Sequence, residues 1–215
     1  MLLQIPHLLN ENQLAEISKT LAKSHFDETK NAALTAREDK NIKALGEQIL
    51  SSLEANPLFI SAALPAKVFP ISFNKDILNK HHEAAIDGAI RHIAGTGFRV
   101  RCDISAVVFL SNPDEYEGGE LVIEDNYGLH KIKLPAGHMI IYPTSAVNYV
   151  NLVKSGERIT ANFWIESMIQ SDAQRTLLFD LDSTIRNLNS DAANAQSVKH
   201  LAGTYHNLLR MWANS

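Results

Sequence analysis

The chain has 215 residues, of which 45% are hydrophobic and 20% are charged. This balance is typical of a globular protein with a sizeable core, and the length fits one domain with at most a small appended subdomain. The formal net charge of -4 excludes the basic excess that nonspecific binding to nucleic acid or to an anionic membrane requires.

The start of the chain and its single cysteine indicate the cellular compartment of the protein. The opening string MLLQIPHLLNENQLAE is broken by Pro6 and has no basic n-region, so we do not expect a signal peptide. No apolar stretch approaches the roughly 20 residues of a membrane span. Cys102 is the only cysteine, which excludes an intramolecular disulfide and favours a reducing compartment. The sequence therefore predicts a cytoplasmic protein.

The first third of the sequence is patterned as helix. Apolar residues recur at helical spacing in two runs, separated by a polar, weakly patterned stretch at 24–39 that we expect to be a loop or a frayed helix. The two runs consist of Leu14, Ile17 and Leu21, and of Ile42, Leu45, Ile49 and Leu53.

From about Leu58 the pattern changes to short strands. Seven segments are rich in Val, Ile, Phe and Tyr and are separated by turn signals such as Gly118-Gly119 and Ser155-Gly156. Closely spaced strands with few helices between them predict a double-sheet jelly roll rather than a parallel α/β sheet. The segments are 68–73, 100–109, 120–124, 130–134, 139–142, 147–153 and 158–165.

The tail from Ser167 onward returns to helix. Its leucine stripe is expected to be core or an oligomer interface. The sequence thus predicts an α+β protein, with a jelly-roll domain and N-terminal helices at 1–166 and a C-terminal helical extension at 167–215. The two tail runs consist of Leu177, Leu178, Leu181, Ile185 and Leu188, and of Leu201, Tyr205, Leu208, Leu209 and Trp212.

Several sequence strings in the centre and the tail are specific to one family, and the longer ones serve no general folding purpose. They are 59–65, 103–111, 113–121, 134–137, 142–143, 156–158 and 163–164, followed by 172–182 and 205–210. Together, over nearly the whole chain, they resemble the PKHD-type hydroxylase family of iron(II)/2-oxoglutarate-dependent dioxygenases.

The resemblance implies a double-stranded β-helix that binds iron(II) and 2-oxoglutarate. In that family a His-x-Asp pair and a later histidine hold the metal and leave positions open for the co-substrate and dioxygen. An arginine ten residues beyond the second histidine binds the far carboxylate of 2-oxoglutarate, a task that suits its planar pair of donors.

Two of the three implied metal ligands are missing here. Ungapped counting from 63–65 to 88–91 puts the His-x-Asp pair on 85–87, which reads Ala-Ile-Asp, and counting from 142–143 to 156–158 puts the second histidine on Asn148. The arginine is present as Arg158. Because imidazoles provide most of the affinity for iron(II), Asp87 and an amide are a poor site. We therefore expect no metal at the degenerate positions Ala85, Asp87 and Asn148, and no cofactor, although the family implies iron(II) and 2-oxoglutarate.

An alternative metal site stays open. The string His81-His82-Glu83 has His-x-Glu spacing, but it needs a four-residue shift in register, so a solvated charged turn is favoured. His138 is expected at the start of a strand, away from Asp87.

Arg158 is the strongest candidate for ligand binding. A period of two along the last strand puts Arg158, Thr160, Asn162 and Trp164 on one face. A buried arginine needs a compensating charge, which we expect from a bound anion or from an internal carboxylate such as Asp87. The candidate ligand-binding residues are Arg158, Asn148, Asn162 and Tyr149.

Three functional hypotheses follow. The first is a noncatalytic descendant that binds a small anionic molecule or pairs, as a homo- or hetero-oligomer, with a related active protein. The second is an enzyme that uses the barrel pocket for metal-independent chemistry through Asp87, Asn148, Tyr149 and Asn162. The third is a 2-oxoglutarate-dependent hydroxylase with rebuilt metal ligands, which the missing histidines make the least favoured.

Overall fold

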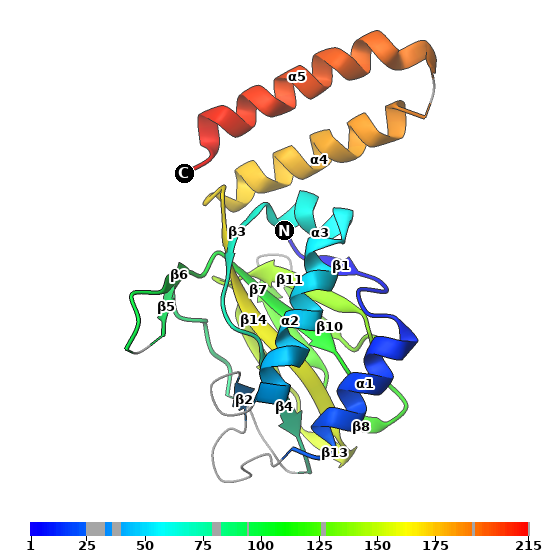
Figure 1. Cartoon of the computed structure of the whole chain (residues 1–215), viewed down its shortest axis with the longest axis vertical. Coiled ribbons are helices and arrows are strands. Elements are labelled where there is room, and N and C mark those ends of the chain that lie inside the picture. Colours follow the sequence, from blue (N-terminus) through cyan, green and yellow to red (C-terminus); the bar gives the residue numbers. More distant parts are fainter. Residues whose placement is uncertain are drawn as a thin grey trace.

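A seven-stranded antiparallel sheet packs against a layer of shorter antiparallel strands. Helices lie at both ends of the chain (Figure 1). The computed structural model describes residues 1–24, 33–35, 40–78, 83–93, 95–125, 128–190 and 192–214. The arrangement is an α+β jelly roll flanked by helices, and the predicted fold class is confirmed.

The larger sheet runs in the order β1-β11-β7-β14-β4-β2, with β3 also paired to β14. Strand β14 is the longest and pairs with β7 on one side and with β4 and β3 on the other, so it forms the middle of the sheet. The strands are β1 (Leu3–Ile5), β2 (Ala33–Thr35), β3 (Pro65–Val68), β4 (Ser72–Asp76), β7 (Ile104–Phe109), β11 (Met139–Pro143) and β14 (Arg158–Ser167).

The opposing layer is made of shorter strands. Strands β10, β9 and β12 form one antiparallel sheet in that order, β13 pairs with β8, and β5 pairs with β6 in a separate ribbon. Their bounds are β5 (Ile90–His92), β6 (Arg99–Arg101), β8 (Tyr116–Gly118), β9 (Leu121–Asp125), β10 (Gly128–Ile132), β12 (Val147–Val150) and β13 (Val153–Gly156).

Helices α1 (Glu11–Leu21), α2 (Lys40–Glu54) and α3 (Pro57–Ala63) cover the outer face of the larger sheet. Asn10 begins α1 with a capping box, in which Asn10 and Gln13 each accept the other's backbone N–H. The apolar stripes of α1 and α2 are buried against alternate residues of the sheet, as their helical spacing predicted. This packing forms the main core.

The alternation of side chains along β14 separates that core from a second, polar face. Ala161, Phe163 and Ile165 point into the main core with the helices. The residues between them point to the other side, toward the smaller sheet, where Val107 and Phe109 of β7 contribute to a second apolar cluster. The central strand therefore supplies the floor of the space between the sheets.

The C-terminal helices α4 (Asp172–Leu188) and α5 (Ala195–Trp212) form a hairpin that projects from one end of the barrel, joined through the 3-10 turn Ala192–Asn194 (Figure 1). Leu178 of α4 packs on Leu64 and Ile169 at the end of the sheet. No helix in the described ranges is long and apolar enough to cross a membrane.

Two details differ from the sequence prediction. The expected strand at 100–109 is interrupted at Asp103, whose carboxylate accepts from Arg101 and from the backbone of Ser167. The N-terminal third is not all helix, because β1 and β2 form the two edges of the larger sheet.

Replacing Gly156 by alanine is expected to lower the free energy of unfolding by about 1–3 kcal/mol, the usual range for backbone strain. Gly156 has a φ of +75°, and a Cβ atom there would lie 2.1 Å from the backbone oxygen of Glu115. Gly203→Ala in α5 is the control. It has no described atom within 4 Å of the new Cβ and should gain about 0.5–1 kcal/mol. Equal melting temperatures for the two variants would contradict this account of the turn.

Candidate functional site

A cavity of about 500 Å³ lies between the two sheets, above the polar face of β14. The larger sheet provides its floor through β4, β7, β11 and β14, and β12 with Leu121 of β9 lies opposite. The lining residues relevant to chemistry are Asn74, Asp76, Ala85, Asp87, Arg91, Tyr142, Asn148, Tyr149, Arg158, Asn162 and Trp164. The structure thus brings the sequence-predicted site residues together around one space.

A row of buried polar atoms follows the cavity face of β14. Arg158 Nε, Thr160 Oγ1, Asn162 Oδ1 and Trp164 Nε1 are all shielded from solvent and have no hydrogen-bond partner among the described residues. Thr160 is 0% exposed. Leaving a buried polar group without a partner costs about 1–3 kcal/mol, so such groups are rare in native structures. Three of these atoms belong to residues that line the cavity, Arg158, Asn162 and Trp164, and they indicate a surface that binds a polar molecule.

Arg158 is compensated by Asp76. The two residues lie directly opposite each other on β14 and β4, and Arg158 Nη1 donates to Asp76 Oδ2 at 2.7 Å. Both side chains are only 2% exposed. The sequence predicted an anion or an internal carboxylate here but named Asp87, and that choice was wrong.

The positions of the two missing histidines face each other. Ala85 donates its backbone N–H to Asn148 at 3.0 Å, and Asn148 returns one at 2.9 Å, which makes an isolated antiparallel bridge. The amide of Asn148 lies 3.4 Å from the carbonyl oxygens of Ala85 and Ala146. Asp87, two residues beyond Ala85, also lines the cavity.

Asp87 is held by its own polar partners. Ser105 Oγ donates to Asp87 Oδ2 at 2.8 Å, and Arg91 Nη2 lies 3.5 Å from Asp87 Oδ1. The guanidinium carbon of Arg91 stacks 3.2 Å from the centre of the Trp164 ring. Asp87 therefore serves as a hydrogen-bond acceptor for Ser105 and lies beside the charge of Arg91.

Two phenols near the cavity stay uncharged. Burial raises the pKa of Tyr142 far above its ordinary value, and the negative charge of Asp87 adds to this effect. Burial also raises the pKa of Tyr116, although the positive charge of Arg158 opposes the rise. Both therefore remain neutral hydrogen-bonding groups throughout the physiological range.

The described donor set does not fit an iron site. In the ranges that the structure describes, no group of three or more His, Cys, Asp or Glu side chains is placed to hold a metal ion. Asp87 is the only ionisable side chain among the three inherited positions, and Ser105 and Arg91 already bind it. His81 and His82 of the alternative string lie outside the described residues, whereas His138 packs edge-on against His7 with ring centroids 4.6 Å apart.

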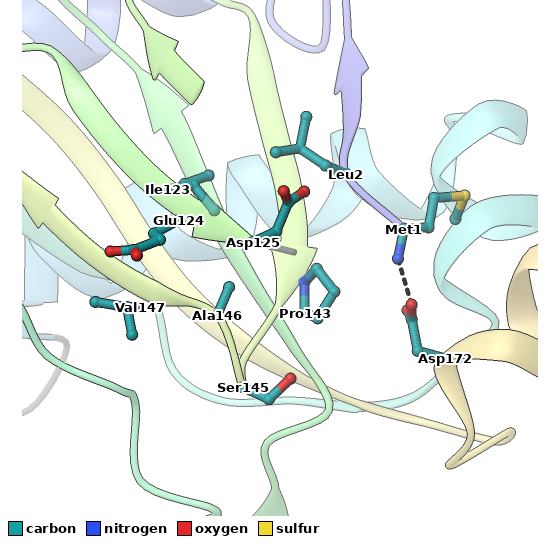
Figure 2. Close-up of a pocket in the computed structure, with 10 residues that line it drawn as sticks. All are labelled: Met1, Leu2, Ile123, Glu124, Asp125, Pro143, Ser145, Ala146, Val147 and Asp172. Carbon is teal, nitrogen blue, oxygen red and sulfur yellow. Dashed lines mark hydrogen bonds and ion pairs between the residues drawn. The ribbon is translucent and has the colours of Figure 1, made fainter. Parts of the chain in front are cut away.

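A second hollow, of about 680 Å³, lies near the end of β1 and has different chemistry (Figure 2). Glu124, Asp125 and Asp172 line it, and the amino group of Met1 donates to Asp172 Oδ2 at 2.5 Å. It contains none of the sequence-predicted site residues, and its carboxylates disfavour an anionic ligand. The smaller cavity on β14 is therefore the better candidate.

Sequence reasoning missed Asp76, Arg91, Ser105 and Tyr142 as members of the site. Asp76 had a readable signal, since Ser72, Asn74 and Asp76 place polar residues at a period of two along β4. The other three depend on how distant segments pack.

The sequence profile of the 2OG-Fe(II) oxygenase superfamily matches residues 73–166, which include the cavity-lining strands of both sheets. The profile of the PKHD-type hydroxylase C-terminal domain matches residues 172–214. A PKHD-type hydroxylase of Methylobacillus flagellatus is 41% identical over 227 residues, covering 100% of each chain. Another, from Paraburkholderia phymatum, is 48% identical over 171 residues, covering 80% of this chain and 75% of the relative. The chain belongs to the PKHD-type hydroxylase family.

Solved structures share the fold at low sequence identity. A 2OG-Fe(II) oxygenase family protein from Burkholderia pseudomallei has a TM-score of 0.56 at 15% identity, covering 77% of this chain and 84% of that one. HygX of Streptomyces hygroscopicus, with nickel, 2-oxoglutarate and hygromycin B bound, has a TM-score of 0.57 at 10% identity and covers 78% of this chain and 84% of its own.

The expectation that the chain takes no cofactor is contradicted by these comparisons. The matching superfamily is that of the 2-oxoglutarate- and iron(II)-dependent oxygenases, and fold neighbours include a viral collagen prolyl hydroxylase in complex with 2-oxoglutarate and HygX with iron bound. The expectation counted the metal ligands of this chain alone, and that count does not bear on 2-oxoglutarate.

Proposed function

We propose that the cavity on β14 binds a small carboxylate-bearing molecule, in an oxygenase-fold protein whose inherited metal site has lost two imidazole ligands. 2-Oxoglutarate is the first carboxylate to test, because the family uses it. The observation that carries the proposal is the row of four buried polar atoms on β14, which offers donors at Arg158 and Trp164 and an acceptor at Asn162.

The roles of the predicted residues follow from their chemistry. Arg158 supplies charge-assisted donors, and its Nε has no partner among the described residues. Asn162 supplies an acceptor from the floor, and Asn148 and Tyr149 supply polar groups from β12. A carboxylate with a carbonyl or hydroxyl group beside it would satisfy several of these atoms at once.

The same residues favour binding, or a chemistry different from the hydroxylation typical of the family. Hydroxylation needs a metal held with open positions by a facial set of ligands, and Ala85 has no donor atom in its side chain. An asparagine amide is a weak neutral ligand in place of imidazole. We therefore propose that the protein retains a carboxylate-binding pocket but uses it for a function other than hydroxylation.

The expected affinity is low. A hydrogen bond to a charged group contributes about 1.5–3 kcal/mol, so two of them at Arg158 contribute about 3–6 kcal/mol, a range that includes roughly millimolar binding. This range suits NMR titration of the full chain with 2-oxoglutarate at millimolar concentrations.

Asn162→Leu is expected to weaken that binding by about two- to tenfold, which is the worth of one hydrogen bond. The variant should melt at the same temperature as the wild type or higher, because it removes a buried acceptor without a described partner. A loss of binding with a gain in stability is what a residue retained for its ligand should give.

Asn207→Leu, on the exposed side of α5, is the matched control and should leave the affinity unchanged. Titrations of wild type and Asn162→Leu that coincide would contradict the assignment of Asn162. Absence of any response to 2-oxoglutarate, succinate and glutarate would contradict the proposal as a whole.

A second candidate function is a hydroxylase with rebuilt metal ligands, and the family relationship favours it. His81, His82 and Glu83 are the side chains that the sequence offers for this role. Anaerobic iron(II) titration with 2-oxoglutarate present tests it. Tight binding at one equivalent, lost in His81→Ala/His82→Ala, supports this candidate, whereas an unchanged titration in that variant rejects it.

A further inference from the structure

We propose that Asp76 is a built-in competitor for the carboxylate site at Arg158 and determines which ligands the cavity accepts. The inference rests on the proposed function, because it concerns the same cavity. It assigns the selectivity of that cavity against dicarboxylates to one residue.

The geometry gives Asp76 the position of a bound carboxylate. Its Oδ2 accepts from Arg158 Nη1 at 2.7 Å, both side chains are 2% exposed, and both line the cavity. The pairing is fixed by the backbone, since Arg158 and Asp76 are direct partners in the register of β14 and β4. A carboxylate ligand that approaches Arg158 must share the guanidinium with Asp76 or displace it.

The other charges of the cavity make this competition stronger. Arg91, the second arginine in the lining, lies 3.5 Å from Asp87, so each arginine already has a carboxylate beside it. Glu83 adds a further negative charge to the lining. A dianion would therefore bring two negative charges into a space whose two described arginines each have a carboxylate beside them, and like charges brought together cost affinity.

The ligand class follows from this balance. The unpartnered atoms of β14 still offer donors and an acceptor, and these bind neutral amide, hydroxyl and carbonyl groups as well as they bind carboxylates. The wild-type cavity therefore favours a carboxylate ligand of low net charge, such as a zwitterion or a monocarboxylate, over a dicarboxylate.

The test compares glutarate with glutaramide, its uncharged diamide, in the wild type and in Asp76→Asn. The wild type should bind glutaramide at least as tightly as glutarate. In Asp76→Asn the affinity for glutarate should rise by about tenfold or more, because one like charge has been removed from a shared site, while that for glutaramide should change by less than about twofold.

Asp103→Asn is the matched control. Asp103 is a carboxylate that pairs with Arg101 at 2.8 Å and does not line the cavity on β14. Its loss should leave the ratio of the two affinities unchanged. An equal gain for glutarate in Asp76→Asn and Asp103→Asn would overturn the inference.

The asparagine of Asp76→Asn retains an oxygen that accepts from Arg158, so the variant should fold. If it does not, Asp76→Ser refolded in formate or in chloride at equal ionic strength provides the answer. A higher yield in formate, whose carboxylate replaces the deleted one, supports the inference, and equal yields overturn it.

The outcomes separate the two proposals. Binding of both ligands to the wild type with an unchanged ratio in Asp76→Asn overturns the role of Asp76 and leaves the proposed function standing. No binding of either ligand to the wild type or to folded Asp76→Asn overturns both. Glutarate binding that is detectable in the wild type and about tenfold or more tighter in Asp76→Asn supports the competitor.

Discussion

Replacing Arg158 by methionine is expected to lower the free energy of unfolding by about 3–5 kcal/mol, because it breaks a buried ion pair by removing the guanidinium that lies 2.7 Å from Asp76. For a chain of this length, 1 kcal/mol corresponds to roughly 2–4 °C in the melting temperature, so the shift should be about 6–20 °C. Thermal unfolding followed by circular dichroism measures it.

The double variant Arg158→Met/Asp76→Leu is the control for this prediction. Replacing both members of a buried ion pair by apolar residues of similar size is often neutral or stabilising, so the double variant should regain most of the lost stability. A single variant that melts within about 2 °C of the wild type would mean that the pair is not desolvated as its 2% exposure indicates.

Restoring the two histidines should produce the second large effect. Ala85→His/Asn148→His is expected to raise the affinity for iron(II) by more than about 100-fold over the wild type. A change in a ligand's outer partner alone is worth about 10–100-fold, and here two ligands are added. The backbones of the two positions are hydrogen-bonded at 2.9 and 3.0 Å, and Asp87 lies on the same cavity. Anaerobic equilibrium titration with iron(II) measures the gain.

Ala85→His alone is the control and should give only a small part of the gain, because it provides one imidazole beside Asp87. A folded double variant with no gain would mean that Ser105 and Arg91 hold Asp87 away from any metal. The part of the cavity around Ala85, Asp87 and Asn148 would then have changed its shape as well as lost its two histidines.

The jelly roll could be predicted because its signal is local. Short apolar segments separated by turn residues predict strands wherever they pack, and the alternation along β14 gave the shared face of Arg158, Thr160, Asn162 and Trp164 in advance. The break at Asp103 could not be predicted. It depends on hydrogen bonds from Ser167, which is 64 positions away in sequence.

The partner of Arg158 could also be predicted only in part. The need for a compensating charge follows from burial alone, so the sequence could require a carboxylate near Arg158. Which carboxylate it is depends on the register of β14 and β4, whose paired residues are 82 positions apart. The polar alternation of Ser72, Asn74 and Asp76 was the available signal for Asp76.

The most direct test of the cavity on β14 as a ligand site is an NMR titration of the wild-type full chain with 2-oxoglutarate, observed at the indole N–H groups. The chain has two tryptophans, and only Trp164 lines the cavity, whereas Trp212 lies on α5. The account predicts a saturable shift of the Trp164 indole signal at millimolar ligand with the Trp212 signal unmoved. A Trp164 signal that stays fixed while other resonances shift, such as those of Leu2 and Val147 in the acidic hollow, would contradict it.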